Sequence, residues 1–155
     1  MKQVQRGDDV PEDLVEYVLR HGKEYIPAVR PNDLSIGQLG MCFDQSMLNA
    51  IKGKYRYVEG IAQHPHESYR WMIHAWVTDG VYVFDPTWRR VDRATKKEVP
   101  LSMIKYVGIE MDVRKVAQFM GETEYMSVLA NGWRLPEVVK EIMPEGRVFD
   151  YEFLD

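Results

Sequence analysis

Three residues in the middle of the chain carry the side chains of a nucleophile, a base and an acid. Cys42 is the only cysteine of the chain, His74 lies in an alternating apolar run, and Asp85 ends a second run. A thiol needs a base to take its proton, and an imidazole needs a carboxylate to hold it in one orientation. These residue types indicate nucleophilic catalysis by cysteine, provided that the fold brings them together.

The dipeptide Asp79-Gly80 separates the two runs and predicts a tight hairpin. Asp-Gly is typical of a type I′ turn, in which both central residues take positive φ. In a two-residue turn of this kind, Thr78 faces Val81. The same register places His74 directly opposite Asp85. Opposed residues of an antiparallel pair have Cα atoms roughly 4.5–5.5 Å apart, so we expect an imidazole–carboxylate hydrogen bond. The alternative is that Asp85, which precedes a proline, only begins a turn.

The segment around Cys42 predicts a helix that begins close to the thiol. A glycine-containing loop leads into apolar residues at helical spacing, namely Phe43, Met47, Ala50 and Ile51. Cys42 then lies in the first turn, where unpaired backbone N–H groups and the helix dipole favour a thiolate. The alternative for a lone cysteine is a small buried hydrophobic residue.

Four short motifs, in this order, resemble the core of the transglutaminase-like superfamily, a branch of the papain-like cysteine enzymes. They are Gly40-Met41-Cys42, Tyr57-Val58-Glu59-Gly60, His74-Ala75-Trp76-Val77, and Asp79-Gly80 followed by Asp85-Pro86-Thr87-Trp88. The motifs lie within residues 37–88 of an expected single domain, 1–155. The resemblance implies that Cys42 is the nucleophile, His74 the general base and acid, and Asp85 the residue that orients the imidazole.

The expected fold class is α+β. We predict a first helix that ends near Gly22, a loop marked by Pro27, a strand over 55–62, the hairpin over 71–84, another strand over 106–111, and a helix capped by Asp112. This order predicts an antiparallel β-sheet packed against helices. The resemblance implies a papain/transglutaminase-like core with the nucleophile at a helix N-terminus.

Three further residues are candidates for the oxyanion site or the cleft. Gln38 precedes the cysteine and is a candidate to donate its amide to a developing oxyanion, as a glutamine does in papain-like enzymes. Trp76 shares a strand face with His74 and is a candidate to shield the imidazole or to line the cleft. Glu59 is a candidate to shape the cleft. The alternatives are a solvated glutamine, a core tryptophan and a solvent-facing glutamate.

We expect no metal and no cofactor. His64 and His66 flank a proline in a polar loop beside Glu67, but a third ligand on a rigid element is missing from the pattern. The cluster of basic residues after Trp88 is interrupted by acids, which favours a solvated face.

Composition is typical of a compact cytoplasmic enzyme. The chain is 45% hydrophobic and 28% charged, and its formal net charge of -4 argues against nucleic acid as a partner. No stretch approaches the roughly 20 apolar residues of a membrane span, and the polar start is unlike a secretory signal. A single cysteine cannot form an internal disulfide, which suits a reducing compartment.

These features predict a cysteine hydrolase or acyltransferase that acts on a protein or peptide substrate with a carboxamide or peptide bond. A thioester intermediate resolved by water makes a protease or deamidase, and one resolved by an amine makes a transglutaminase. The sequence leaves that choice open, and it leaves the oligomeric state open. The resemblance to the transglutaminase-like superfamily ranks hydrolysis first. The alternatives are a non-catalytic binding domain that retains the fold and an NlpC-like cell-wall peptidase.

Overall fold

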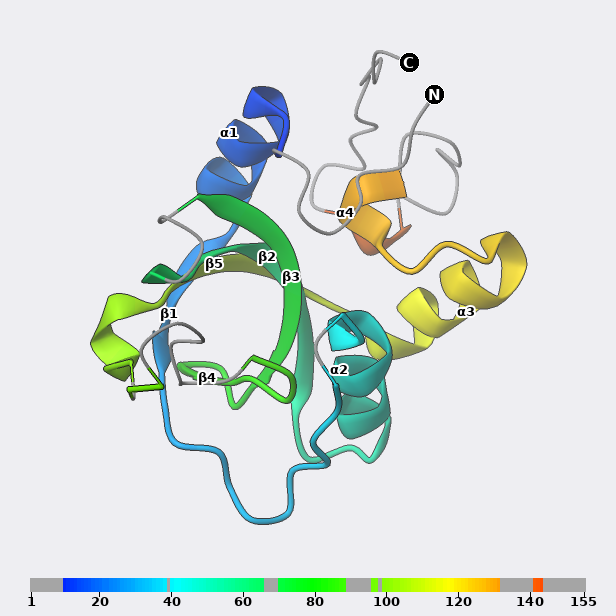
Figure 1. Ribbon diagram of the computed structural model, residues 1–155. Helices are drawn as coiled ribbons and strands as arrows, with labels where there is room; N and C mark the ends of the chain where they lie inside the picture. The colour runs from blue at the N-terminus through cyan, green and yellow to red at the C-terminus, as the bar shows by residue number, and fades with distance from the viewer. Residues whose placement is uncertain are drawn as a thin grey trace.

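In the part of the chain that the structure describes, five strands form a closed barrel and four short helices lie outside it (Figure 1). This computed structural model describes residues 10–38, 40–65, 70–88, 96–97, 99–131 and 141–143. The strands are β1 (Lys23–Pro27), β2 (Arg56–Gln63), β3 (Trp71–Thr78), β4 (Tyr82–Phe84) and β5 (Lys105–Met111). The helices are α1 (Glu12–His21), α2 (Cys42–Ile51), α3 (Val113–Thr123) and α4 (Val128–Asn131).

The barrel closes because β1 lies between β4 and β5. The strand order is β1-β4-β3-β2-β5, and β5 returns to pair with β1. Neighbours are antiparallel except β1 and β4, which are parallel. The expected fold class, an antiparallel sheet packed against helices with a papain/transglutaminase-like core, is therefore wrong. The chain forms a small closed barrel with short helices on its outside.

A proline explains why β1 was expected to be a loop. Pro27 has no N–H and usually argues against a strand. In the parallel pair with β4, however, the donors come from its two neighbours. Ile26 N–H donates to the Val81 carbonyl and Ala28 N–H to the Val83 carbonyl, each at 3.1 Å. The ladder therefore needs no donor at Pro27, and a strand that ends in proline can still close the barrel.

Side chains that alternate along the strands divide the core into two clusters. The barrel-interior cluster consists of Tyr25, Val58, Ala62, Trp76, Val83, Val99, Ile104 and Tyr106. The outer cluster packs the helices against the other face of the strands and includes Leu14, Tyr17, Val18, Cys42, Tyr57, Ile61, Val116 and Phe119. The candidate site lies where α2 meets the strand that carries His74, so it draws on both clusters.

Trp76 fills the barrel because two glycines make room for its indole ring. Gly60 on β2 pairs with Gly108 on β5. A Cβ atom on Gly60 would lie 2.8 Å from the indole Cη2, and one on Gly108 would lie 2.7 Å from the indole Cζ2. Both distances are too short for carbon atoms, so the ring can lie across these strands only while both positions are glycine.

Several local predictions are confirmed. α1 ends one residue before Gly22, and the Asp112 side chain caps α3 by accepting from the Arg114 N–H at 2.9 Å and the Lys115 N–H at 3.4 Å. The strands expected over 55–62 and 106–111 correspond to β2 and β5. Among the described helices, none has the length and apolar character that crossing a membrane would require.

Candidate active site

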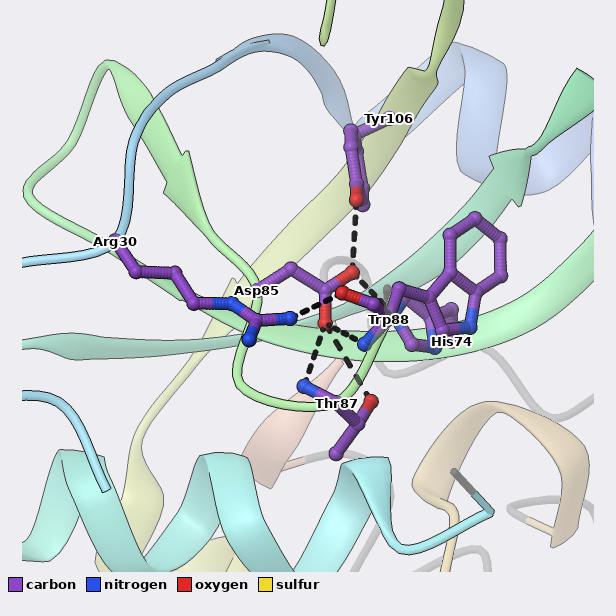
Figure 2. A network of polar contacts seen from close by, with 6 residues as sticks. All are labelled: Arg30, His74, Asp85, Thr87, Trp88 and Tyr106. Carbon is purple, nitrogen blue, oxygen red and sulfur yellow. Dashed lines mark hydrogen bonds and ion pairs between the residues drawn. The ribbon is translucent and has the colours of Figure 1, made fainter. Parts of the chain in front are cut away.

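His74 and Asp85 form a buried hydrogen-bonded pair at the end of β4 (Figure 2). The distance from His74 Nε2 to Asp85 Oδ2 is 2.7 Å, and the two residues are 2% and 7% exposed. His74 comes from β3, and Asp85 is the first residue after β4. The predicted imidazole–carboxylate contact is therefore present, with the carboxylate on Nε2 of the ring.

The hairpin register that led to this expectation is wrong by two residues. The observed pairs are Val77 with Phe84 and Thr78 with Val83, so Thr78 does not face Val81. If the ladder were continued, Asp85 would lie beside Trp76 rather than opposite His74. Because a shift of two keeps each side chain on its original face of the sheet, the pair still meets, diagonally instead of directly.

The longer turn has a local cause in the Asp79 side chain. A type I′ turn needs positive φ at both central residues, but only Gly80 has it, at 114°. Asp79 Oδ1 instead accepts from the N–H groups of Val81 and Tyr82, at 3.0 and 2.9 Å. This capping arrangement turns the chain over four residues rather than two.

Asp85 has a hydrogen-bond donor on every side of its carboxylate. Oδ2 accepts from His74 and from the Tyr106 hydroxyl, both at 2.7 Å. Oδ1 accepts from the backbone N–H groups of Thr87 and Trp88, both at 3.0 Å, and from the Thr87 hydroxyl at 3.4 Å. The alternative interpretation, in which Asp85 begins a turn, is thus also correct: one oxygen organises the turn and the other holds the imidazole.

These contacts make the pair ionic. Burial alone would raise the pKa of Asp85, but the His74 charge, the His74 hydrogen bond and the N–H groups of Trp88 and Thr87 lower it to about 2. Burial alone would lower the pKa of His74, but the charges of Asp85 and Cys42 and hydrogen bonds to both raise it to about 10. Because the carboxylate is ionised and can only accept, Nε2 carries the proton and donates.

Cys42, the third predicted residue, lies near the imidazole. It is the first residue of α2, and Met41 precedes the helix without a side-chain cap. Cys42 is 7% exposed, and its charge and its side chain contribute to the raised pKa of His74. Since Asp85 occupies Nε2, the ring nitrogen left for the thiol is Nδ1. The structure therefore brings the three predicted residues close together, with the imidazole hydrogen-bonded to the carboxylate and Cys42 near the imidazole.

The loop before α2 is tied to the helix and to the Asp85 turn. Asn49 accepts from the Ser35 N–H at 2.9 Å and donates to the Ser35 carbonyl at 2.8 Å, and Gln45 donates to the same carbonyl at 3.0 Å. The Gly37 N–H donates to the Pro86 carbonyl at 3.0 Å. These bonds connect the segment leading to Cys42 with the turn that presents Asp85.

The buried face of α2 differs slightly from the expected one. Cys42, Ser46, Asn49 and Ala50 are buried, whereas Ile51, expected on the apolar stripe, is 55% exposed. Phe43 and Met47 pack partly buried against the outer cluster. The face is rotated because Asn49 must point inwards to reach Ser35, a contact that apolar spacing cannot reveal.

A tryptophan covers the imidazole, but it is Trp88 rather than Trp76. The rings of Trp88 and His74 are stacked, with centroids 4.1 Å apart and an angle of 27° between the planes. Trp76 is completely buried in the barrel interior, with its ring centroid 6.2 Å from that of His74. Trp76 is thus a core residue in this structure, the plainer of its two interpretations, and it does not line an open cleft.

Glu59 lies apart from the thiol–imidazole pair. Its Oε1 accepts from the Tyr57 hydroxyl at 2.8 Å and from the Val128 N–H at 3.0 Å. Its Oε2 accepts from the Ser127 hydroxyl at 3.1 Å and from the Leu129 N–H at 3.0 Å. The side chain is fully buried, so it is neither solvent-facing nor directed into a cleft; it holds the start of α4 against β2.

Two further expectations concern the surroundings of the site. The Gln38 side chain is exposed, and its role at an oxyanion stays a prediction. His64 is buried with its ring edge-on to Trp88, at a centroid distance of 5.3 Å, whereas His66 and Glu67 lie outside the described residues. Within the described ranges, no group of three or more His, Cys, Asp or Glu side chains is arranged to hold a metal ion.

Sequence reasoning missed the residues that surround Asp85 and His74. Tyr106 was expected only as part of a strand, and Trp88 only as part of the motif that follows Asp85. Thr87 appeared in the motif that follows Asp85, and its place two residues after an aspartate is the local signal of a capped turn. Tyr106 had no such signal, because its contact with Asp85 depends on how β5 joins the barrel.

Comparison of the chain with protein-family models, with curated proteins and with solved structures finds no match. The resemblance of the four motifs to the transglutaminase-like superfamily therefore stays a prediction.

Proposed function

We propose that this protein is a cysteine-dependent amide hydrolase or acyltransferase with Cys42 as nucleophile. The observation that supports this most strongly is the buried hydrogen bond between His74 and Asp85, with Cys42 near the same imidazole. A charged imidazole–carboxylate pair is costly to bury unless the charges are well compensated, and such pairs are concentrated at functional sites. The four motifs assign the same roles to these residues, although the fold implied with them is not found.

In the proposed reaction, the Cys42 proton already rests on Nδ1 of the charged His74, whose Nε2 proton Asp85 holds. The thiolate attacks the carbonyl carbon of a carboxamide or peptide bond, and the tetrahedral intermediate collapses to a thioester as the C–N bond breaks. His74 returns its proton to the departing ammonia or amine. Water activated by the same imidazole then releases the acid and regenerates the thiol, or an amine takes the acyl group instead.

Hydrolysis is the first choice for the second half of the reaction, with a protein or peptide as the substrate. A thiol that acts as a nucleophile must stay reduced. The lone cysteine therefore also supports a cytoplasmic, reducing location.

An acyl-enzyme trapping experiment tests the proposal. The protein is incubated with short peptides that carry glutamine carboxamides or internal peptide bonds, quenched in acid, and examined by intact-mass spectrometry together with ammonia release. We expect a thioester adduct on the wild-type protein and none on Cys42→Ala. Ser46→Ala, one turn further along α2, is the matched control and should retain the adduct. Wild-type protein that forms neither adduct nor product would contradict the proposal.

A second candidate is a binding domain that keeps this arrangement without turnover. The observation that favours it is the burial of Cys42, which is 7% exposed and packed in the outer cluster. Such a domain would bind peptides without forming a thioester. Peptide binding that is unchanged in Cys42→Ala, with no adduct on the wild-type protein, would favour this candidate.

A further inference from the structure

Two side chains from different strands share one oxygen of Asp85. His74 on β3 and Tyr106 on β5 both bind Oδ2 at 2.7 Å, and Figure 2 shows the phenol reaching the carboxylate from the side opposite Thr87. Tyr106 is 2% exposed, so its hydroxyl is held in the interior of the protein. The mechanism proposed above gives this phenol no task.

We propose that Tyr106 is a positioning residue of the candidate active site, which sets the orientation and basicity of His74 through Asp85. Its catalytic meaning rests on the proposed function. Its effect on the imidazole does not, because that effect is present in the protein without substrate.

The orientation follows from how the carboxylate is anchored. Backbone N–H groups of Thr87 and Trp88 fix Oδ1 within the turn, and Tyr106 fixes Oδ2 from across the barrel. A carboxylate anchored at both oxygens cannot rotate, so its remaining lone pair on Oδ2 points at His74 before any substrate arrives. Such pre-organisation holds the imidazole in the single orientation that the thiol requires.

The basicity follows from competition for one oxygen. A phenol that donates to Oδ2 withdraws negative charge from it, which makes that oxygen a weaker acceptor for the imidazolium. Tyr106 therefore moderates the stabilisation that Asp85 gives to protonated His74. Without the Tyr106 hydroxyl, the negative charge on Oδ2 acts on His74 alone. The imidazolium is then stabilised further.

Other charged or titratable groups surround the pair without binding Oδ2. Cys42 on α2 is near enough to the imidazole to affect the pKa of His74, and His64 packs against Trp88. Arg30 donates to the Trp88 carbonyl, and the Tyr25 ring meets Trp76 edge-on inside the barrel. Within the described part of the chain, the side chains that donate to Oδ2 are those of His74 and Tyr106.

Tyr25 provides a matched control. It pairs directly with Tyr106 across β1 and β5, and both rings lie edge-on to Trp76, at 5.9 and 5.1 Å between centroids. Tyr25→Phe removes a hydroxyl from the same cluster without touching Asp85, so it reports what the loss of a barrel phenol does by itself.

The test is an NMR titration of the His74 ring in wild-type protein, Tyr106→Phe and Tyr25→Phe, with the signal assigned by its loss in His74→Ala. We expect Tyr106→Phe to raise the pKa of His74 by about half a unit or more. Tyr25→Phe should leave it within about 0.2 unit of wild type. No shift, a downward shift, or an equal shift in both variants would overturn the inference.

A fluorinated tyrosine at position 106 should shift the pKa of His74 in the opposite direction. It also tests the inference if Tyr106→Phe does not fold. Fluorine makes the phenol a stronger donor, so the pKa of His74 should fall rather than rise; an unchanged or raised value overturns the inference. Turnover measured in parallel separates the two proposals. Normal thioester formation without these shifts removes the role of Tyr106 alone, whereas the shifts without any turnover remove the proposed function alone.

Discussion

Two carboxylates, Asp85 and Glu59, are buried in the part of this small protein that the structure describes, and their surroundings differ in one decisive respect. Each accepts hydrogen bonds on both oxygens from hydroxyl and backbone N–H groups. Asp85 has in addition a cationic partner, His74, whereas the donors to Glu59 are all neutral. The pKa of Asp85 is lowered to about 2. Burial raises the pKa of Glu59, against the opposing effect of its donors at Leu129, Val128, Tyr57 and Ser127.

Hydrogen bonds alone do not mark a catalytic carboxylate. Neutral donors satisfy Glu59 and attach α4 to β2, which is a structural task. A charged imidazole next to a thiol gives Asp85 a chemical task, because the proton on that imidazole can move. Both residues were candidates for the site on sequence grounds. They differ in their hydrogen-bond donors, because Asp85 binds a charged imidazole and Glu59 binds only neutral groups.

The largest expected effect is the loss of activity in Asp85→Asn. An amide cannot stabilise the imidazolium, and its NH₂ group would face either the backbone donors or the Tyr106 hydroxyl. We expect turnover to fall by about 10³- to 10⁴-fold. The unfolding free energy should also fall, by about 1–3 kcal/mol, because donors lose their acceptor. Kinetics together with urea unfolding check both values; activity within tenfold of wild type would contradict the role of Asp85.

Glu59→Gln is the matched change and should affect stability rather than chemistry. The amide NH₂ group must face a backbone N–H donor whichever way it is turned, which costs about 1–3 kcal/mol of unfolding free energy. Activity per folded molecule should stay within about threefold of wild type, since no contact to His74 or Cys42 is removed. Turnover that falls as far as in Asp85→Asn, measured where both variants are folded, would place Glu59 in the active site after all.

The smallest expected effect is that the contributions of Asp85 and Glu59 to the unfolding free energy depend on pH in opposite directions. Stabilisation from Asp85 is present above its unfolded pKa of 3.8 and is lost as the pH falls towards about 2. The contribution of His74 is lost only as the pH rises from 6.5 through about 10. The Glu59 contribution is complete below 4.5 and declines as the pH rises above it.

Between about pH 3 and about pH 6, the stability advantage of wild type over Asp85→Asn should therefore grow, and its advantage over Glu59→Gln should shrink. Urea unfolding at several pH values measures both differences. If both stability differences changed with pH in the same direction, Asp85 and Glu59 would not differ in the pH dependence of their contributions.

Features that depend on neighbouring residues could be predicted from the sequence. The Asp112 cap of α3, the end of α1 before Gly22 and the position of Cys42 at the start of α2 all follow from local patterns. The His74–Asp85 contact was predicted through a register that proved wrong by two residues, and it survived because side chains alternate with a period of two.

Features that depend on distant parts of the chain could not be predicted. A strand that ends in Pro27 is compatible with a ladder because its partner β4 runs parallel to it, and the local sequence does not reveal that pairing. The roles of Tyr106 and Glu59 depend on which elements β5 and α4 bring to them, which no spacing encodes. The fold class was wrong for the same reason, since barrel closure is a property of long-range pairing.

The central claim is that His74 activates Cys42, and the rate at which iodoacetamide alkylates this single thiol tests it most directly. The measurement compares folded wild-type protein with folded His74→Ala at neutral pH, after melting curves have shown that both are native. We predict a slowing of about tenfold or more in His74→Ala, because the imidazole no longer stabilises the thiolate. Slow labelling of the wild-type protein that His74→Ala leaves unchanged would contradict the account.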